Sequence, residues 1–144
     1  MRIAISTLHI RRGKTGSHEP YLRSLVQALA QADRTNEYLL LVTEANRGYF
    51  CRRQENFREV VFPDFVQWLP LHILCEQAVV PLVLMRHRVD VVHCPGNVGL
   101  VVAPCKKVVT LHIDLNRPQA ASINWLKLAY YTVMMKLTTA RADR

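Results

Sequence analysis

Two histidines, two carboxylates and a glycine-containing loop have residue types and positions that could do chemistry. His93 and His112 each close a short apolar run, and Asp114 follows His112 after one residue. An imidazole or a carboxylate at such a position can contact a hydroxyl group of a ligand, such as a sugar, or act as a base. For His93, a local hydrogen bond that orders its own loop is the alternative.

Glu76 and the loop at residues 13–17 are the other candidates. Glu76 lies in an apolar stretch, where an unpaired buried carboxylate is costly, so it must find a structural partner or lie at a site. The loop precedes a helical pattern, and amides at a helix start can bind a phosphate or another anion at Gly16 and Ser17. Its spacing is neither a P-loop nor Gly-x-Gly-x-x-Gly, and a plain glycine turn is the alternative.

Apolar runs of strand length alternate with helical patterns, which indicates an α/β domain with a mostly parallel sheet. We predict strands over 2–7, 38–42, 57–62, 90–94 and 107–112, and helices over 20–32, 71–88 (interrupted or kinked near Pro81) and 122–142. Ligands of such sheets bind beyond the carboxyl ends of the strands. The loops 7–16, 93–97 and 112–114 are therefore expected to converge on one rim.

The composition fits a single globular domain of 144 residues, with 50% hydrophobic and 21% charged residues, and excludes a disordered chain. The net charge of +8 is spread along the chain in small basic clusters and favours anionic partners. Zinc-finger spacing, an RNP-type aromatic run and a helix-turn-helix pattern are lacking, so nucleic acid is not an expected partner.

The cysteines and the apolar runs bear on cellular location. Cys51, Cys75, Cys94 and Cys105 form no Cys-x-x-Cys pair, so unpaired, mostly buried thiols and no metal site are expected. No uncharged run approaches the roughly 20 apolar residues of a membrane span, and the first residues are too short for a signal peptide. We expect a cytoplasmic protein. The predicted helix 71–88, apolar with a basic end, also suits peripheral contact with the inner face of a membrane.

Several short motifs occur in an order that resembles a known family, the family 4 glycosyltransferases of the GT-B fold. The similar stretches are 1–6 (the opening strand), 16–22 (a glycine loop, often Gly-Gly-x-Glu-x-Tyr), 75–77 (Trp-Glu-Gln), 90–95 (Asp-x-x-His), 108–112 (Thr-x-His-Asp) and 140–144 (the run before the next strand). Two positions depart from the family pattern. Ser17 stands where the second glycine is usual, and Ile113 separates His112 from Asp114.

The resemblance implies a Rossmann-like three-layer domain, in which residues 1–144 are the N-terminal, acceptor-side half and the donor-binding C-terminal domain is absent. It implies a retaining transfer of a sugar from a nucleotide-sugar donor to a glycan, lipid-linked or small-molecule acceptor, without a metal or another cofactor. This half alone is expected to be inactive. The implied roles place His112 beside the transferred sugar, and Gly16, Ser17, His93, Asp114 and Glu76 around the acceptor or the donor phosphates.

Two other functions remain open from the sequence. The first is a non-catalytic α/β binding domain that docks on a partner subunit or an anionic membrane, as the basic surface and the apolar helix suggest. The second is a Rossmann-like binder of a dinucleotide or a phosphate with unrelated chemistry.

Overall fold

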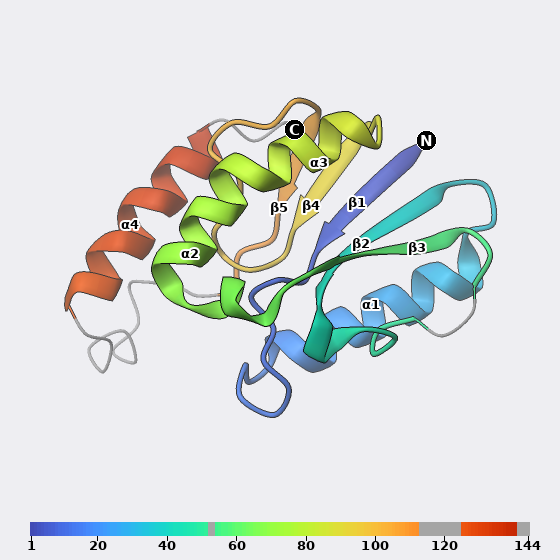
Figure 1. Cartoon of the computed structure of the whole chain (residues 1–144), viewed down its shortest axis with the longest axis horizontal. Helices are drawn as coiled ribbons and strands as arrows, with labels where there is room; N and C mark the ends of the chain where they lie inside the picture. The colour runs from blue at the N-terminus through green and yellow to red at the C-terminus, as the bar shows by residue number, and fades with distance from the viewer. Residues whose placement is uncertain (52–53, 113–124, 141–144) are drawn as a thin grey trace.

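Five parallel strands form one sheet in the order β3-β2-β1-β4-β5. The computed structural model describes residues 1–51, 54–112 and 125–140. The strands are β1 (Arg2–Ser6), β2 (Glu37–Thr43), β3 (Phe57–Phe62), β4 (Val91–Cys94) and β5 (Lys106–Val109) (Figure 1). The parallel pairing and the strand order confirm the predicted α/β fold with Rossmann-like layers.

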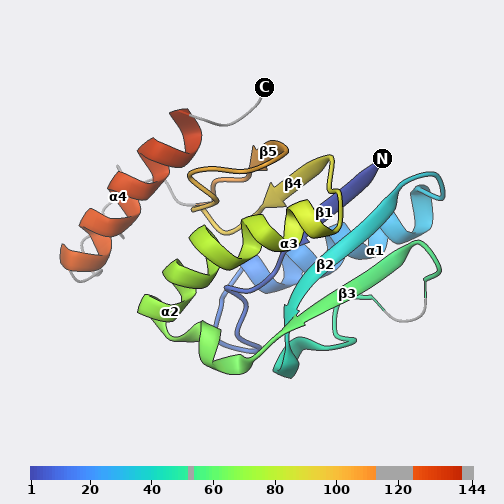
Figure 2. The same cartoon turned by 45° about the horizontal axis from the view of Figure 1, so that its top comes forward.

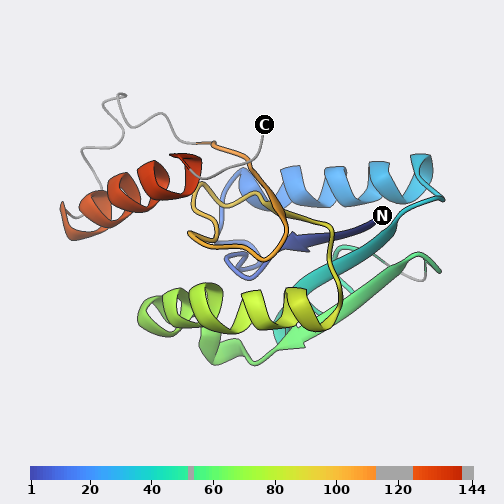
Figure 3. The ribbon, with the colours of Figure 1, turned by 90° about the horizontal axis from the view of Figure 1, so that it is seen from above.

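Helices cover both faces of this sheet, as Figure 3 shows from above. Because successive side chains of a strand point to opposite faces, Leu39 and Leu40 of β2 enter two different cores. On one face α1 (His18–Ala32) packs Leu22 and Val26 against the strands. On the other face the helix formed by α2 (Leu69–Leu74), η3 (Cys75–Val79) and α3 (Val80–Arg86) does the same. The uninterrupted apolar runs of the strands follow from this double coverage.

The helix predicted over 71–88 runs from Leu69 to Arg86 and contains a π-helical segment, η3, instead of a sharp kink. Pro81 explains the position of this segment. Proline has no N–H, so the carbonyl of Gln77 loses its usual donor four residues ahead. Widening the preceding turn accommodates this loss without breaking the helix. Pro70, in the first turn, explains why the helix begins earlier than predicted.

The last strand is shorter than predicted, because β5 ends at Val109 and not at residue 112. The Thr110 amide still donates to the Cys94 carbonyl (3.1 Å), but the Thr110 carbonyl accepts from Asn97 (3.3 Å), a loop residue. The chain therefore leaves the sheet before His112. The predicted helix 122–142 corresponds to α4 (Trp125–Ala140), with its other residues outside the described part. In Figure 2, α4 lies on the β5 side of the sheet.

Short 3-10 turns complete the connections that follow β2 and β3. They are η1 (Glu44–Asn46) and η2 (Asp64–Gln67), and η2 leads directly into α2. Because all five strands are parallel, these turns leave the sheet at its carboxyl edge, as do the loops that follow β1 and β4.

Candidate functional site

The strand order reverses between β1 and β4. From β1 the chain runs outward through β2 to β3, and it then returns to place β4 on the other side of β1. Loops that leave adjacent strands at such a point diverge, and the crevice between them is the usual ligand site of an open α/β sheet. The loop after β1, the loop after β4 and the residues after β5 all come to this crevice.

Three histidines from these segments form a cluster, called here the histidine cluster: His9, His18 and His112. The ring centroids of His9 and His18 lie 5.7 Å apart, and those of His18 and His112 lie 4.6 Å apart. Tyr21, one turn along α1 from His18, presents its ring to His112 at 4.6 Å. The predicted convergence of loops therefore brings aromatic and imidazole rings from three segments together.

Burial and mutual repulsion keep the inner members of the cluster uncharged. Burial, followed by positive charge on His18, His72 and His112, lowers the pKa of His9 to about 3. Burial, with His112 as the second cause, also lowers the pKa of His18. Both rings are consequently neutral near neutral pH, and each carries one N–H donor and one acceptor nitrogen.

Two ring nitrogens of the histidine cluster are shielded from solvent and have no hydrogen-bond partner among the described residues: Nε2 of His9 and Nδ1 of His18. The other nitrogen of His18 lies 3.4 Å from Nδ2 of Asn97. His9 is tightly enclosed, since a Cβ on Gly96 would lie 2.9 Å from its Nδ1. Buried polar atoms normally find partners, so two unpaired nitrogens on neighbouring rings suggest a place where a ligand supplies them.

Asn97 holds His112 in place beyond the end of β5. This buried asparagine adopts a left-handed backbone conformation with φ 67, which asparagine tolerates better than most residues. Its Oδ1 accepts a hydrogen bond from the His112 amide. The His112 side chain remains exposed. His112 therefore has a fixed backbone and a ring that faces both the histidine cluster and solvent.

His93 takes the local alternative. Its Nε2 lies 2.7 Å from Oγ1 of Thr110, so the ring joins the ends of β4 and β5. Burial lowers the pKa of His93, with His112 as the second cause. A neutral, half-buried His93 that orders the rim is thus what the geometry supports.

Glu76 lies inside the molecule, in the π-helical segment η3. Burial raises its pKa to about 8, while burial lowers the pKa of its neighbour His72. The Glu76 Oε2 and His72 Nε2 atoms are 3.6 Å apart, too far for a hydrogen bond. Although the two groups are close enough to form an ion pair, both pKa shifts favour the uncharged forms. The contact is therefore one between a protonated Glu76 and a neutral His72.

The glycine loop is exposed at Gly16 and Ser17. Gly16 has φ +60, a conformation that favours glycine. The carboxylate of Glu19, in the first turn of α1, accepts hydrogen bonds from the Gly13 amide (2.7 Å) and the Tyr49 hydroxyl (2.5 Å). An anion at this loop would therefore compete with an internal carboxylate, which weakens the predicted anion site.

The remaining predictions concern Asp114, metals and cysteines. Asp114 lies outside the described residues. Within residues 1–51, 54–112 and 125–140, no three His, Cys, Asp or Glu side chains are arranged to hold a metal ion. Cys51, Cys75 and Cys94 are free thiols, and the last two are buried.

Sequence reasoning did not single out His9, His18, Tyr21 or Asn97 as site residues. A signal existed for the two histidines, since both lie in or beside the loop that was expected to reach the rim. Tyr21 and Asn97 are identified only by the packing of α1 and the loop after β4 against the residues that follow β5.

The fold and its crevice define a Rossmann-like α/β domain. Comparison with protein-family models, with curated proteins and with solved structures found no match to this chain. Within the described residues, one helix, Leu69–Arg86, is long and apolar enough to cross a membrane by length and composition alone, and 22% of it is buried.

Proposed function

We propose that this chain is the acceptor-side domain of a glycosyltransferase that uses a nucleotide-sugar donor. The observation that carries the proposal is the histidine cluster at the crevice between β1 and β4. His112, the residue to which the family resemblance gives the leading role, has ring contacts with His18 and Tyr21 there. Parallel sheets bind ligands at this position.

The chemistry of the cluster suits a hydroxyl-rich ligand. A sugar hydroxyl both donates and accepts hydrogen bonds, and a neutral imidazole offers one of each. The exposed ring of His112 can make such bonds directly. The unpaired nitrogens of His9 and His18 are shielded in this structure, so they bond to a ligand only when the histidine cluster opens around it. The edges and faces of Tyr21 and His112 can pack against the apolar face of a sugar ring.

His112 is proposed to act on the reacting sugar and the other residues to position it. The ring of His112 is exposed, and its amide is fixed by Asn97, so it can orient the transferred sugar or stabilise charge that develops there. His93 maintains the rim through Thr110. The donor nucleotide is expected to bind mainly to a second domain, as in the family that the sequence resembles.

Turnover of the complete gene product tests the proposal. It is incubated with UDP-, GDP- and ADP-sugars and a glycan or lipid extract as the acceptor source, and release of nucleoside diphosphate is measured. We expect release with one donor class. His112→Ala should reduce it by about a hundredfold, the usual scale for a positioned catalytic side chain.

His87→Ala is the matched control. His87 is half-buried and lies near the amino edge of the sheet, where its carbonyl accepts a hydrogen bond from Arg2. It should retain wild-type turnover. Absence of nucleoside diphosphate release from every donor, or equal turnover of the His112→Ala protein, would overturn the proposal. Tight binding of NAD without binding of UDP would favour the dinucleotide alternative.

A further inference from the structure

The outer face of the Leu69–Arg86 helix is apolar and exposed. Val80 and Leu84 face the sheet and are buried, whereas Leu74, Leu82 and Met85 are 60%, 61% and 53% exposed. In Figure 3 this helix forms an outside layer, and no described element covers its outer side. Several large exposed side chains along one helix mark an interaction surface.

Two aromatic side chains extend this face at the start of the helix. Phe65 in η2 and Trp68, directly before α2, are 63% and 64% exposed. The Trp68 amide donates to the Phe65 carbonyl (3.0 Å), and the His72 amide donates to the Trp68 carbonyl (2.8 Å). Trp68 is therefore presented on a hydrogen-bonded backbone and does not sit at a loop tip. Tryptophan and phenylalanine on the apolar face of a helix are typical of contacts with the interfacial region of a membrane.

A hollow of about 730 Å³ beside these aromatics is lined with cationic side chains, and we call it the cationic hollow. Its cations are Arg11, Arg12 and Lys14, from the loop after β1, and Phe65 and Trp68 form another part of its wall. Arg11 donates a hydrogen bond to the carbonyl of Gln67, which holds its charge next to Trp68.

One carboxylate also lines the cationic hollow, that of Asp64, and its Oδ1 accepts a hydrogen bond from the Ala45 amide. Three cations against one carboxylate leave the hollow positive. At the far end of the helix, Arg86 and Arg88 are also exposed. The apolar face is thus bordered by positive charge at both ends.

We propose that the outer face of the Leu69–Arg86 helix and the cationic hollow dock on an anionic lipid bilayer. Apolar side chains enter the boundary between headgroups and acyl chains, and the flanking cations meet anionic headgroups. This surface is distinct from the crevice at β1 and β4, and the inference does not depend on the proposed sugar transfer.

The helix is proposed to lie on the bilayer and not to cross it. Crossing would require Val80 and Leu84 to leave the core of the sheet and the buried Glu76 to enter lipid. A second copy of this chain is a poorer occupant, because both ends of the face are positive and any two-fold contact would set cations of one copy against cations of the other. The net charge of +8 adds to that repulsion.

Sedimentation with vesicles tests the proposal. One vesicle is phosphatidylcholine alone, and the other is a mixture with phosphatidylglycerol. We expect at least about tenfold tighter binding to the anionic vesicle, weakening as salt is added. The double variant Phe65→Ser with Trp68→Ser, and separately Lys14→Glu with Arg86→Glu, should each lower binding at least about tenfold.

Matched controls use equally exposed residues elsewhere. Val102 is 64% exposed in the loop after β4, and Lys106 is exposed on β5. Val102→Ser and Lys106→Glu should bind as the wild type does. Because every substituted side chain is exposed, thermal unfolding of each variant should match that of the wild type.

Three results would overturn the proposal. They are failure to bind either vesicle, equal binding to both vesicles, and unchanged binding of the Phe65→Ser, Trp68→Ser protein. A dimer in light scattering that the same double variant abolishes would assign the face to a second copy instead. Sugar transfer is not measured in any of these assays, so their failure leaves the proposed function intact.

Discussion

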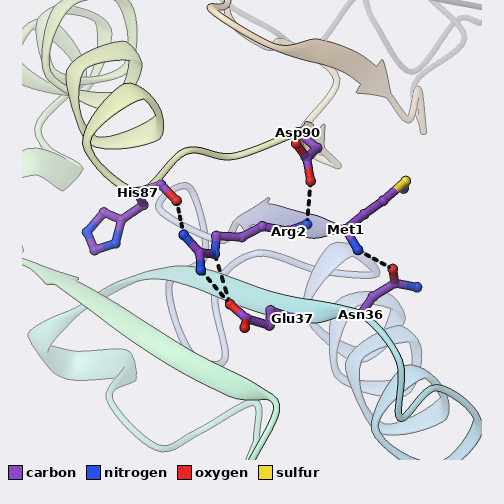
Figure 4. A network of polar contacts seen from close by, with 6 residues as sticks. All are labelled: Met1, Arg2, Asn36, Glu37, His87 and Asp90. Atoms are coloured by element: carbon purple, nitrogen blue, oxygen red, sulfur yellow. Dashed lines mark hydrogen bonds and ion pairs between the residues drawn. The ribbon is translucent and has the colours of Figure 1, made fainter.

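The two edges of the sheet differ in how completely their polar groups are paired. At the amino edge, Arg2 donates to Glu37 (2.7 Å) and to the His87 carbonyl, while its amide donates to Asp90 (2.7 Å) (Figure 4). The amino group of Met1 donates a hydrogen bond to Oδ1 of Asn36 (2.9 Å). At the carboxyl edge, by contrast, ring nitrogens of His9 and His18 have no partner among the described residues.

This difference suggests that the amino edge serves to hold the strands together, whereas the carboxyl edge can bind a ligand. Unpaired buried polar atoms reduce stability, since each loses its hydrogen bond to water. A fold can keep them where a bound molecule supplies the missing partner. We therefore expect substitutions at the amino edge to affect stability without affecting binding, and those in the histidine cluster to do the reverse.

The largest predicted effect concerns Glu76, the carboxyl group that burial keeps protonated in the folded protein. Between the ordinary pKa of 4.5 and about 8, the folded protein keeps the Glu76 proton that the unfolded chain loses. The free energy of unfolding should therefore fall as pH rises through this interval. Glu76→Gln removes the titrating group, so the variant does not lose stability in this way. Its free energy of unfolding, relative to that of the wild type, should rise by several kcal/mol between pH 5 and pH 8, because each pH unit contributes about 1.4 kcal/mol.

Urea unfolding of both proteins at roughly pH 5 and pH 8 measures this divergence. The lowered pKa values of His9 and His18 give the opposite slope below their ordinary pKa, but both proteins share it. Parallel curves for the two proteins would show that Glu76 is ionised in the folded state.

The next effect tests how tightly the loop under the crevice is packed. A Cβ added at Gly99 would lie 2.8 Å from Cβ of Cys94 and 3.3 Å from a methyl of Val109. Gly99→Ala should reduce the free energy of unfolding by about 1–3 kcal/mol, the usual cost of overpacking. Thermal unfolding measures it, with the exposed Val102→Ala as the control that should stay within about 0.5 kcal/mol. An unchanged Tm would mean that the backbone of this loop can shift to make room for the added methyl group at little cost in stability.

A smaller effect is expected at the amino edge. Arg2→Met removes the Glu37 ion pair and the hydrogen bond to the His87 carbonyl, but keeps the aliphatic stem. The ion pair is partly exposed, so the loss should be about 1 kcal/mol and should shrink at high salt. Ligand binding and vesicle binding should not change. A change in either would contradict the separation of the two edges.

The smallest effect on stability is predicted inside the histidine cluster. His9→Leu removes a shielded nitrogen without a described partner, so the free energy of unfolding should change by less than about 0.5 kcal/mol or rise. Binding of a sugar acceptor, followed by calorimetry, should weaken at least about tenfold. A loss of stability above about 2 kcal/mol would assign His9 a structural role instead.

The architecture was predictable because it depends on local patterns. Apolar runs located four of the strands and a weak alternation located β3, while helical spacing located α1 and the helix Leu69–Arg86. The π-helical segment at 75–79 was not predictable, since the same residues satisfy an ordinary helical period. The end of β5 was misplaced because Asn97, a residue distant in sequence, takes the hydrogen bond that a longer strand would have used.

The candidate site was predictable only in its location. Strand ends placed His93 and His112 at one rim, but the sequence could not show that His93 pairs with Thr110 while His112 meets His18 and Tyr21. Such contacts depend on how α1 and the loop after β4 pack across the crevice. The shielding of His9 likewise follows from its approach to Gly96, which no local pattern encodes.

The central place of β1 has a consequence for folding during synthesis. Ile3 pairs with Tyr38 on one side and with Val91 on the other. The β1-α1-β2 unit can form as soon as its residues leave the ribosome, but the second edge of β1 stays open until β4 has been made. Pairing over such long sequence separations is slow, and an open strand edge invites aggregation. The nascent chain therefore carries an unpaired edge of β1 until β4 has been synthesised, and this is the interval in which misassembly is most favoured.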